Sequence, residues 1–434
     1  NIEFEKHFFY FVLEYIAMKK FFFLFLWFLT IILTAIWTFE NPEIIEKIKS
    51  ELKKNKKIET KLLEDKGVNI SANSFTVKLT QILENNSKTA FVTYPSNIKK
   101  FDPSNLTIFT QSGIKIKKNN SKKLNLPNYF TLERNGGVKT IFYFNDNTFA
   151  LISGSEGKCF FASIVFVEIG EEILRSKCLP EKPSNNDFNG LGSSNVHFNE
   201  SILIALGTPE KQVGKNSLLA QEDSSIFGKI LEIKKKNLSE VLEKNTKELE
   251  IEIFSKGHRV PQGLTILNNK IFNVEHGPKG GDELNHVQKY KNYGWPVVSY
   301  GTNYLKDNGG DGKSIKVNHK NEGYDEPLFA FVPSVGISAL NNCPQVLKNY
   351  YKKPCLMALS LYGNSLRKGH SLIIFLLNEN LDKVQSIEKI PLNNLVLRHF
   401  VTDKKNIIYE DDKGAIYISA DKKGIYKIEF KNFR

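Results

Sequence analysis

The stretch that decides the fold runs from Gly257 to Gly301 and reads GHRVPQGLTILNNKIFNVEHGPKGGDELNHVQKYKNYGWPVVSYG. Apolar residues alternate loosely from Ile266 to Val274, around Asn268-Asn269, and this pattern predicts two short strands joined by a hairpin turn. A polar turn rich in glycine and proline begins at Glu275. Because functional side chains are often carried on turns at the ends of rigid strands, this turn is a candidate site. A solvated loop is the alternative.

Short apolar runs separated by turn residues continue from about residue 68 to residue 434. They have the length and the content of branched and aromatic residues that are typical of β-strands. The predicted strands include Phe75–Leu79, Ala90–Tyr94, Thr107–Thr110, Thr140–Phe144, Phe160–Val167, Ser201–Leu206, Lys229–Ile233, Ile407–Tyr409, Ala415–Ser419 and Ile425–Phe430. Many short strands with regular breaks predict an all-β sandwich, barrel or propeller, and periodicity does not choose among the three.

The N-terminal part of the chain has a different character. Residues 21–39 contain no charge, and nineteen such residues are enough for a helix to span a membrane. Lys19 and Lys20 precede this run, so the positive-inside rule places residues 1–20 in the cytoplasm and the remainder outside. Met18 is a natural start, which would make the residues before it upstream sequence. A cleaved signal peptide, and hence a secreted protein, is the alternative to an inner-membrane anchor.

Residues 40–67 are expected to connect this anchor to the β-rich domain of residues 68–434. Asn41-Pro42-Glu43 has the residue types of a helix start, and Gly67 is a plausible helix end. We therefore predict a lysine-rich helical stalk, with a disordered linker as the alternative.

The charge of the chain is strongly positive. It has 60 lysines and arginines against 47 aspartates and glutamates, for a formal net charge of +13. Only six of the basic residues are arginines, at positions 134, 175, 259, 367, 398 and 434. The lysines are spread along the whole length, which indicates a solvated basic surface. Without an arginine-rich stripe or a nucleic-acid-binding motif, no nucleic-acid partner is expected.

The four cysteines are Cys159, Cys178, Cys343 and Cys355, and none forms a CxxC pair. An even number of cysteines beyond a membrane anchor predicts two local disulfides, 159–178 and 343–355. Four reduced thiols are the alternative, which a cytoplasmic location would require. The spacing does not match a zinc site.

Three linked motifs connect the chain to a known family. GHR-x-PQGL at 257–264, EHGP-x-GGDELN at 275–285 and NYGWPVVSYG at 292–301 resemble the glucose/sorbosone dehydrogenase family. That family contains the soluble quinoprotein glucose dehydrogenases and the aldose sugar dehydrogenases. The resemblance implies a six-bladed β-propeller that holds pyrroloquinoline quinone (PQQ) and calcium on its axis.

The resemblance also assigns a catalytic base. His197 lies in the stretch Gly190–Pro209, before an apolar run, where the family carries a histidine that takes the anomeric hydroxyl proton of the sugar. A neutral imidazole suits this task near pH 7. The family pattern continues with an arginine and ends in Gly-Asp, and here these positions hold Ser201 and Thr208. A structural histidine at the start of a strand is the alternative.

PQQ carries three carboxylates, and arginine suits planar, bidentate pairing with carboxylates better than lysine does. The resemblance places Arg259, Arg367 and Arg398 at cofactor positions, together with Gln262 and His276. Salt bridges on the surface or between blades are the alternative role for these arginines.

Calcium would be bound by the backbone carbonyls of Gly277 and Pro278, which the resemblance identifies with a Gly-Pro turn of the family. Three residues that follow form a second possible hard-cation cluster: Asp282, Glu283 and Asn285. We expect instead that they hold the turn through hydrogen bonds to backbone amides.

The sequence therefore predicts a PQQ-dependent oxidation of an aldose at C1 to the lactone, with electrons passed to a periplasmic acceptor. Val260 and Val396 replace an Asn and an Arg of the family pattern. These changes motivate a second hypothesis, a non-catalytic propeller with a degenerate cofactor site that binds a glycan or a protein partner. A third hypothesis is a hydrolase that uses the carboxylates near residues 275–283.

Overall fold

The computed structural model describes residues 30, 60–62, 67–118, 120–192, 194–210, 213–244, 248–304, 311–361 and 370–434. The chain divides into two compact units, residues 1–57 and 58–434, and all of the described residues except Thr30 belong to the second. The predicted membrane segment, residues 21–39, thus falls outside the described residues apart from Thr30. Within the described part, no helix is both long and apolar enough to cross a membrane. The membrane anchor remains a prediction.

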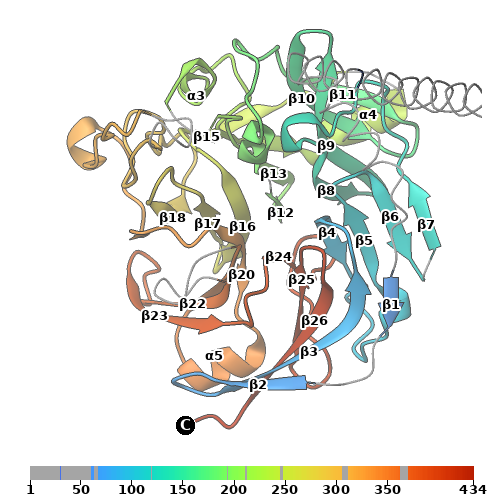
Figure 1. Cartoon of the computed structure of the whole chain (residues 1–434), viewed down its shortest axis with the longest axis vertical. Helices are drawn as coiled ribbons and strands as arrows, with labels where there is room; N and C mark the ends of the chain where they lie inside the picture. Colours follow the sequence, from blue (N-terminus) through green and yellow to red (C-terminus); the bar gives the residue numbers. More distant parts are fainter. Residues whose placement is uncertain are drawn as a thin grey trace, which may run out of the picture. The chain divides into compact units, whose positions relative to one another are not determined.

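In the described part of the second unit, six antiparallel sheets surround a common axis as the blades of a β-propeller (Figure 1). Blades one to three, from the axis outward, are β4 (Thr89–Thr93), β5 (Thr107–Thr110), β6 (Ile114–Lys117) and β7 (Asn120–Lys123); β8 (Val138–Phe144), β9 (Asn147–Glu156), β10 (Cys159–Phe166) and β11 (Glu171–Arg175); and β12 (Ser194–Phe198), β13 (Ser201–Leu206), β14 (Lys229–Lys234) and β15 (Glu252–Lys256).

Blades four to six are β16 (Pro261–Leu267), β17 (Lys270–Glu275), β18 (Asp282–Val287) and β19 (Phe329–Phe331); β20 (Ile337–Asn342), β21 (Cys355–Ser360), β22 (Ser371–Leu377) and β23 (Val384–Pro391); and β24 (Leu397–Phe400), β25 (Ile416–Ala420), β26 (Gly424–Lys431) and β3 (Thr76–Asn85). Each innermost strand contacts the innermost strand of the next blade, and β24 contacts β4, so the ring closes. The predicted six-bladed propeller is confirmed.

Blade six joins the two ends of the described domain. Its outermost long strand β3 comes from the N-terminal side, and β26 comes from the C-terminal end of the chain. The two strands pair antiparallel from Thr76↔Lys431 to Glu84↔Gly424, and they run side by side in blue and red in Figure 1. These ladder hydrogen bonds join the N-terminal and C-terminal parts of the described domain. They therefore hold the ring of blades closed at blade six.

The C-terminal end of the predicted stalk is not helical. Within the expected stalk of residues 40–67, Thr60–Leu62 forms strand β1, and Gly67 begins strand β2 (Gly67–Ser71) instead of ending a helix. Both strands pair with β3. The outer side of β3 offers unpaired backbone groups, and these extended segments satisfy them.

Asparagine pairs make the tight turns that the sequence analysis expects. Asn268 and Asn269 have φ of 46° and 62° between β16 and β17, and Asn145 and Asp146 have φ of 45° and 63° between β8 and β9. Asparagine and aspartate tolerate this left-handed backbone, and two such residues in succession match the twist of a hairpin.

Two disulfides join Cys159 to Cys178 and Cys343 to Cys355, with Cα–Cα distances of 5.1 and 5.5 Å. Both predicted pairings are confirmed. The first connects the start of β10 to the segment after β11, and the second connects β20 to β21 across α5 (Gln345–Tyr351).

The other described helices are short and lie in connections between strands. They are α3 (Lys215–Leu218), α4 (Lys235–Lys244) and the 3-10 turns η1 (Pro103–Asn105), η2 (Glu133–Asn135), η3 (Asp187–Leu191) and η5 (Lys320–Glu322). The connections that carry η3 and α3 lie before β12 and after β13, and they bring polar residues to one end of blade three.

Candidate active site

A pocket of about 410 Å³ opens where connections of blades three and four meet. It mixes two cationic side chains, two carboxylates and an imidazole with backbone and amide groups. Its lining comprises Asn186, Asp187, Asn189, Gly190, Glu210, Arg259, Val260, His276, Lys279 and Tyr304. Two of the predicted site residues, Arg259 and His276, therefore share one cavity.

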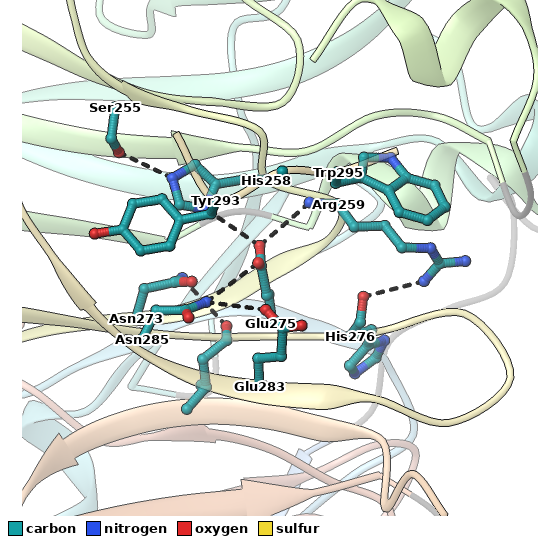
Figure 2. Close-up of polar contacts among 12 residues, drawn as sticks. Ser255, His258, Arg259, Asn273, Glu275, His276, Glu283, Asn285, Tyr293 and Trp295 are labelled. Carbon is teal, nitrogen blue, oxygen red and sulfur yellow. Dashed lines mark hydrogen bonds and ion pairs between the residues drawn. The ribbon is translucent and has the colours of Figure 1, made fainter. Parts of the chain in front are cut away.

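Arg259 is held at both its backbone and its side chain. Its N–H donates to Glu275 Oε2 at 3.2 Å, and its carbonyl accepts from the N–H of Thr208 at 2.8 Å. The guanidinium Nη1 donates to the carbonyls of Gly277 at 2.6 Å and His276 at 3.1 Å (Figure 2). Its Cζ also lies 5.1 Å from the centre of the Trp295 ring. The arginine of the GHR motif is thus pinned to the EHGP turn.

Thr208 occupies the position where the family pattern has an aspartate. It supports the same arginine by another route, because its Oγ1 accepts from Trp295 Nε1 at 3.1 Å while its N–H binds the Arg259 carbonyl. A Cβ atom at Gly190 would lie 2.2 Å from the Thr208 carbonyl oxygen. Only glycine at 190 therefore permits this close approach of the two loops at the pocket.

Glu275 is the centre of a buried network rather than a pocket residue. Its Oε2 lies 3.3 Å from His258 Nδ1, and its Oε1 accepts from Asn285 Nδ2 at 3.2 Å. His258 also shares a hydrogen bond of 2.9 Å with Ser255 Oγ, and its ring stacks on Tyr293 (Figure 2). His258 is fully buried and Glu275 is 3% exposed. The histidine of the GHR motif therefore positions the backbone of its neighbour Arg259.

Glu283 adds a second buried carboxyl to this network, within 3.4 Å of Asn285 Nδ2. Burial raises its pKa well above the ordinary value, and the adjacent Glu275 raises that pKa further. Glu283 therefore retains a proton where a solvated glutamate would lose it. Because both carboxyls are buried and bonded to neighbours, they do not provide the exposed acid pair that the hydrolase hypothesis requires.

Asp282 fixes the EHGP turn, as the sequence analysis expects. Its Oδ2 accepts from the N–H groups of Val335, Gly336 and Ile337 at 3.0, 2.6 and 3.1 Å. Its Oδ1 accepts from the N–H of Gly277 at 3.2 Å. Among the described residues, no group of three or more His, Cys, Asp or Glu side chains is placed to hold a metal ion. Asp282 therefore bonds to backbone amides in this structure.

His276 is influenced by the charges of Arg259 and of the other predicted arginine that the structure describes, Arg398. Burial lowers the pKa of His276, the charge of Asp282 opposes this, and the charges of Arg259 and Arg398 lower it further. The imidazole is therefore neutral in a cationic environment. Arg398 itself lies on β24 and pairs through Nε with both oxygens of Asp421, at 3.2 and 3.1 Å. The positive charge of Arg398 is therefore partly neutralised by the carboxylate of Asp421.

Gln262 lies on β16 and lines a small axial cavity with His399 and Asn406 rather than the larger pocket. Burial, followed by the charge of Arg398, lowers the pKa of His399 to about 4.

Arg367 falls outside the described residues. Pro278 lies beside Gly277 in the turn after β17, and the Gly277 carbonyl is the one that Arg259 binds.

His197, the predicted base, lies at the other end of blade three. It pairs with Ile202 next to the β12–β13 hairpin, whereas the pocket is at the start of β12, beyond Gly192. Within β12, His197 lies three residues beyond Ser194, roughly 10 Å of extended chain at 3.3 Å per residue. Burial, and then the charges of Lys235 and Lys405, lower the pKa of His197 to about 4. The structure thus does not bring His197 together with Arg259 and His276, because its place on the strand puts it at the opposite end.

Three charged residues of the pocket are absent from the sequence-based prediction: Asp187, Glu210 and Lys279. Asp187 follows two asparagines in a polar run before Gly190, and Glu210 follows Gly207-Thr208-Pro209. Both residues lie in runs of turn-forming residues next to strands, and such runs often carry functional side chains. What the sequence did not show is that the two runs meet.

The chain matches proteins of known family. Residues 169–423, more than half of the chain, match the family described as glucose / sorbosone dehydrogenase. An aldose sugar dehydrogenase of Escherichia coli is 40% identical over 91 residues, 20% of this chain and 24% of that protein. Quinoprotein glucose dehydrogenase B of Acinetobacter calcoaceticus is 45% identical over 58 residues, 13% of this chain and 12% of that protein.

These aligned regions span no more than about a quarter of either relative. A crystal structure of glucose dehydrogenase shares the fold over a greater length, with a TM-score of 0.60 at 20% identity, and covers 82% of this chain and 99% of that one.

Proposed function

The chain belongs to the glucose/sorbosone dehydrogenase family, and on that premise we propose that it oxidises an aldose at C1 to the lactone with PQQ as its cofactor. The observation that carries this proposal is the pocket in which Arg259, His276 and Lys279 lie together with the carboxylates of Asp187 and Glu210. It offers cationic groups for an anionic cofactor and carboxylates for the hydroxyls of a sugar.

The cationic and imidazole side chains of the pocket are of the kind that can hold PQQ, beside the two carboxylates assigned to the sugar. The cofactor has three carboxylates, and the guanidinium of Arg259, the ammonium of Lys279 and the neutral imidazole of His276 line one cavity. When bound, its ortho-quinone supplies a two-electron acceptor. The chain's own residues orient the sugar, exclude water and take up the hydroxyl proton. Val260, which lines the same cavity, offers an apolar surface where the family pattern has a polar side chain.

We also propose that the turn at Gly277 and Pro278 binds calcium, which requires Arg259 to move. The Gly277 carbonyl accepts a 2.6 Å hydrogen bond from Arg259. A calcium ion bound to that oxygen would face the guanidinium at close range, and like charges repel. We propose that calcium binding displaces Arg259 from this carbonyl and leaves the guanidinium for a cofactor carboxylate. Calcium should therefore increase the affinity for PQQ.

We place the reaction outside the cytoplasm, with a periplasmic electron acceptor. The two disulfides support this location, because they persist in oxidising compartments. The predicted anchor of residues 21–39 would attach the propeller to the inner membrane.

Reconstitution tests the proposed function. The purified protein is titrated with PQQ in the presence and absence of calcium, and then mixed with aldoses and a redox dye. We expect a shifted absorption spectrum and sugar-dependent dye reduction. No cofactor binding at micromolar concentrations would contradict the proposal.

That negative result would favour the second candidate, a propeller that binds a glycan or a protein without catalysis. The observation behind it is that Arg398 is already paired with Asp421 and that Val260 lines the pocket. Glycan binding by a protein that binds no PQQ would support this candidate.

A further inference from the structure

The pocket holds two carboxylates that the family resemblance does not assign. Asp187 begins η3, before β12, and Glu210 follows β13, so the chain brings them together from two loops of blade three. Asp187 is 5% exposed, and its Oδ2 accepts from the N–H of Ser184 at 2.6 Å. Its Oδ1 is buried and has no hydrogen-bond partner in the described part of the protein. A buried carboxylate oxygen in a ligand-sized pocket indicates that a polar ligand completes it.

Glu210 is held in position by its own loop. Its Oε2 accepts from the N–H of Ser217 at 2.7 Å, and a Cβ at Gly214 would lie 2.2 Å from its Oε1. The loop is fastened to the segment before η3 by Asn216, which exchanges hydrogen bonds of 3.0 Å with the backbone N–H and carbonyl of Glu181. The carboxylate thus has a fixed place beside Asp187.

The electrostatic setting suits proton uptake near neutral pH. Burial raises the pKa of Glu210 to about 6, the charges of Asp187 and Glu181 raise it, and hydrogen bonds from Ser217 and Asn216 oppose the rise. At pH 7 the group is mainly ionised and able to accept a proton, and a general base works best when its pKa is close to the working pH.

The other groups at the pocket are less suited to act as the base. His276 lies in the field of Arg259 and Arg398, so a proton there would add a third positive charge. Lys279 is exposed, so its side chain is not held in a fixed position at the pocket. His197 lies at the opposite end of blade three. Glu210 is left as a fixed, partly buried acceptor in the pocket.

We propose that Glu210, next to Asp187, is the general base of this chain, replacing the imidazole that the family resemblance leads one to expect. The inference rests on the proposed function. In the step, Glu210 takes the proton of the anomeric hydroxyl as the O–H bond breaks. The C1–H bond breaks with it, its hydride is accepted by the bound quinone, and the C1–O bond becomes the lactone carbonyl. The sugar loses two electrons and the quinone gains them.

Glu210→Gln tests the assignment in protein reconstituted with PQQ and calcium. General-base catalysis contributes roughly 10²–10⁴-fold, so we expect kcat/KM to fall by at least about 100-fold while PQQ affinity changes by less than about threefold. Glu156→Gln is the matched control, because Glu156 pairs with Arg175 at 2.7 Å on the surface of blade two and does not line the pocket. It should keep its activity within about twofold, since exposed ion pairs contribute little.

The pH profile gives a second measurement. Wild-type kcat/KM should fall as the pH drops through about 6, where Glu210 becomes protonated. Asp187→Asn should move this limb to lower pH, because it removes a neighbouring negative charge. The charged and titratable groups around Glu210 are Asp187, Glu181, Lys215, Arg259, Lys279 and His276.

Two readouts do not depend on the sugar reaction or on the stability of one variant. Carboxyl ¹³C NMR of the cofactor-free protein should show a resonance that titrates near pH 6 and is missing in Glu210→Gln. Formate should partly restore turnover to Glu210→Ala, which a merely structural carboxylate would not allow. An active wild type with unchanged kcat/KM in Glu210→Gln, or no formate rescue, would overturn the base assignment alone. A wild type that binds no PQQ would overturn the proposed function itself.

Discussion

Blades three and four are neighbours around the axis, but they carry their polar residues differently. In blade four, the GHR, EHGP and GDELN segments are joined to one another by the bonds of Glu275, Arg259 and Asp282. In blade three, the histidine that the resemblance singles out lies at one end of β12, and the pocket lies at the other. Where a motif includes the turns that position it, sequence locates the site, but a single residue on a strand does not reveal which end of the blade it occupies.

The largest expected effect is on the stability of the blade-four turn. Asp282→Ala removes the acceptor of four backbone N–H groups, and each unsatisfied buried donor costs about 1–3 kcal/mol. We expect the free energy of unfolding in urea to fall by about 4 kcal/mol or more. Asp223→Ala, which removes a surface ion pair with Lys256, should change it by less than about 1 kcal/mol. Equal effects would mean that Asp282 does not hold the turn.

Arg259→Lys tests whether blade four provides the anion site. Lysine keeps the charge but loses the planar, bidentate geometry, so we expect PQQ affinity to fall by about 10- to 100-fold. Spectral titration of the cofactor measures this affinity. Arg434→Lys, at the exposed C-terminus, serves as the control and should bind PQQ like the wild type. An unchanged affinity in Arg259→Lys would move the cofactor away from this turn.

Calcium removal tests the link between Arg259 and the Gly277 carbonyl. If calcium displaces the guanidinium, chelation should weaken PQQ binding by about tenfold, the equivalent of one displaced charge-assisted hydrogen bond of roughly 1.4 kcal/mol. Isothermal titration with and without a chelator gives the two affinities. Identical values would show that calcium and PQQ bind independently.

The buried pair of Glu275 and Glu283 predicts how stability depends on pH. The pKa of Glu283 is raised in the folded protein, so its contribution is full below the ordinary pKa of glutamate and is lost as the pH rises through the folded value. Glu283→Gln should therefore flatten the decline of stability toward high pH, because glutamine has no proton to lose. Urea unfolding at pH 5 and pH 9 compares the two proteins. A parallel pH dependence in both would contradict the assignment.

The smallest effect is expected at the far end of blade three. The sequence-based assignment predicts that His197→Ala abolishes turnover. The position of the ring, beside the hairpin and near Lys235 and Lys405, predicts instead a change of less than about twofold in kcat/KM. Steady-state dye reduction decides between them, and a loss of about 100-fold would restore His197 as the base.

Much of the fold was predictable because its signals are local. Thr107–Thr110 and Ser201–Leu206 form strands β5 and β13 with the predicted bounds, since branched and aromatic runs between turn residues favour strands. Ile407–Tyr409 is wrong as a strand: within the β24–β25 connection it makes one isolated bridge, between Ile408 and Thr402. Apolar content alone does not provide a neighbouring strand with which to pair.

The candidate site was predictable in part. Arg259 and His276 lie in the pocket because their motifs contain the residues that fix them, Glu275 and Asp282. Asp187 and Glu210 were missed because their loops are joined by hydrogen bonds between Asn216 and Glu181, which are 35 residues apart in the sequence. Long-range hydrogen bonds of this kind leave no periodic signal.

The sequence by itself determined an all-β domain with two local disulfides and a polar turn at residues 275–285, and its family resemblance supplied the six-bladed propeller. Hairpin turns, strand periodicity and contiguous motifs are encoded within a few residues. Only the tertiary structure decided which side chains share the cavity, because that depends on where each residue lies along its strand and on which loops meet at the same end of the ring. That is why the structure places Glu210, and not His197, in the pocket with Arg259.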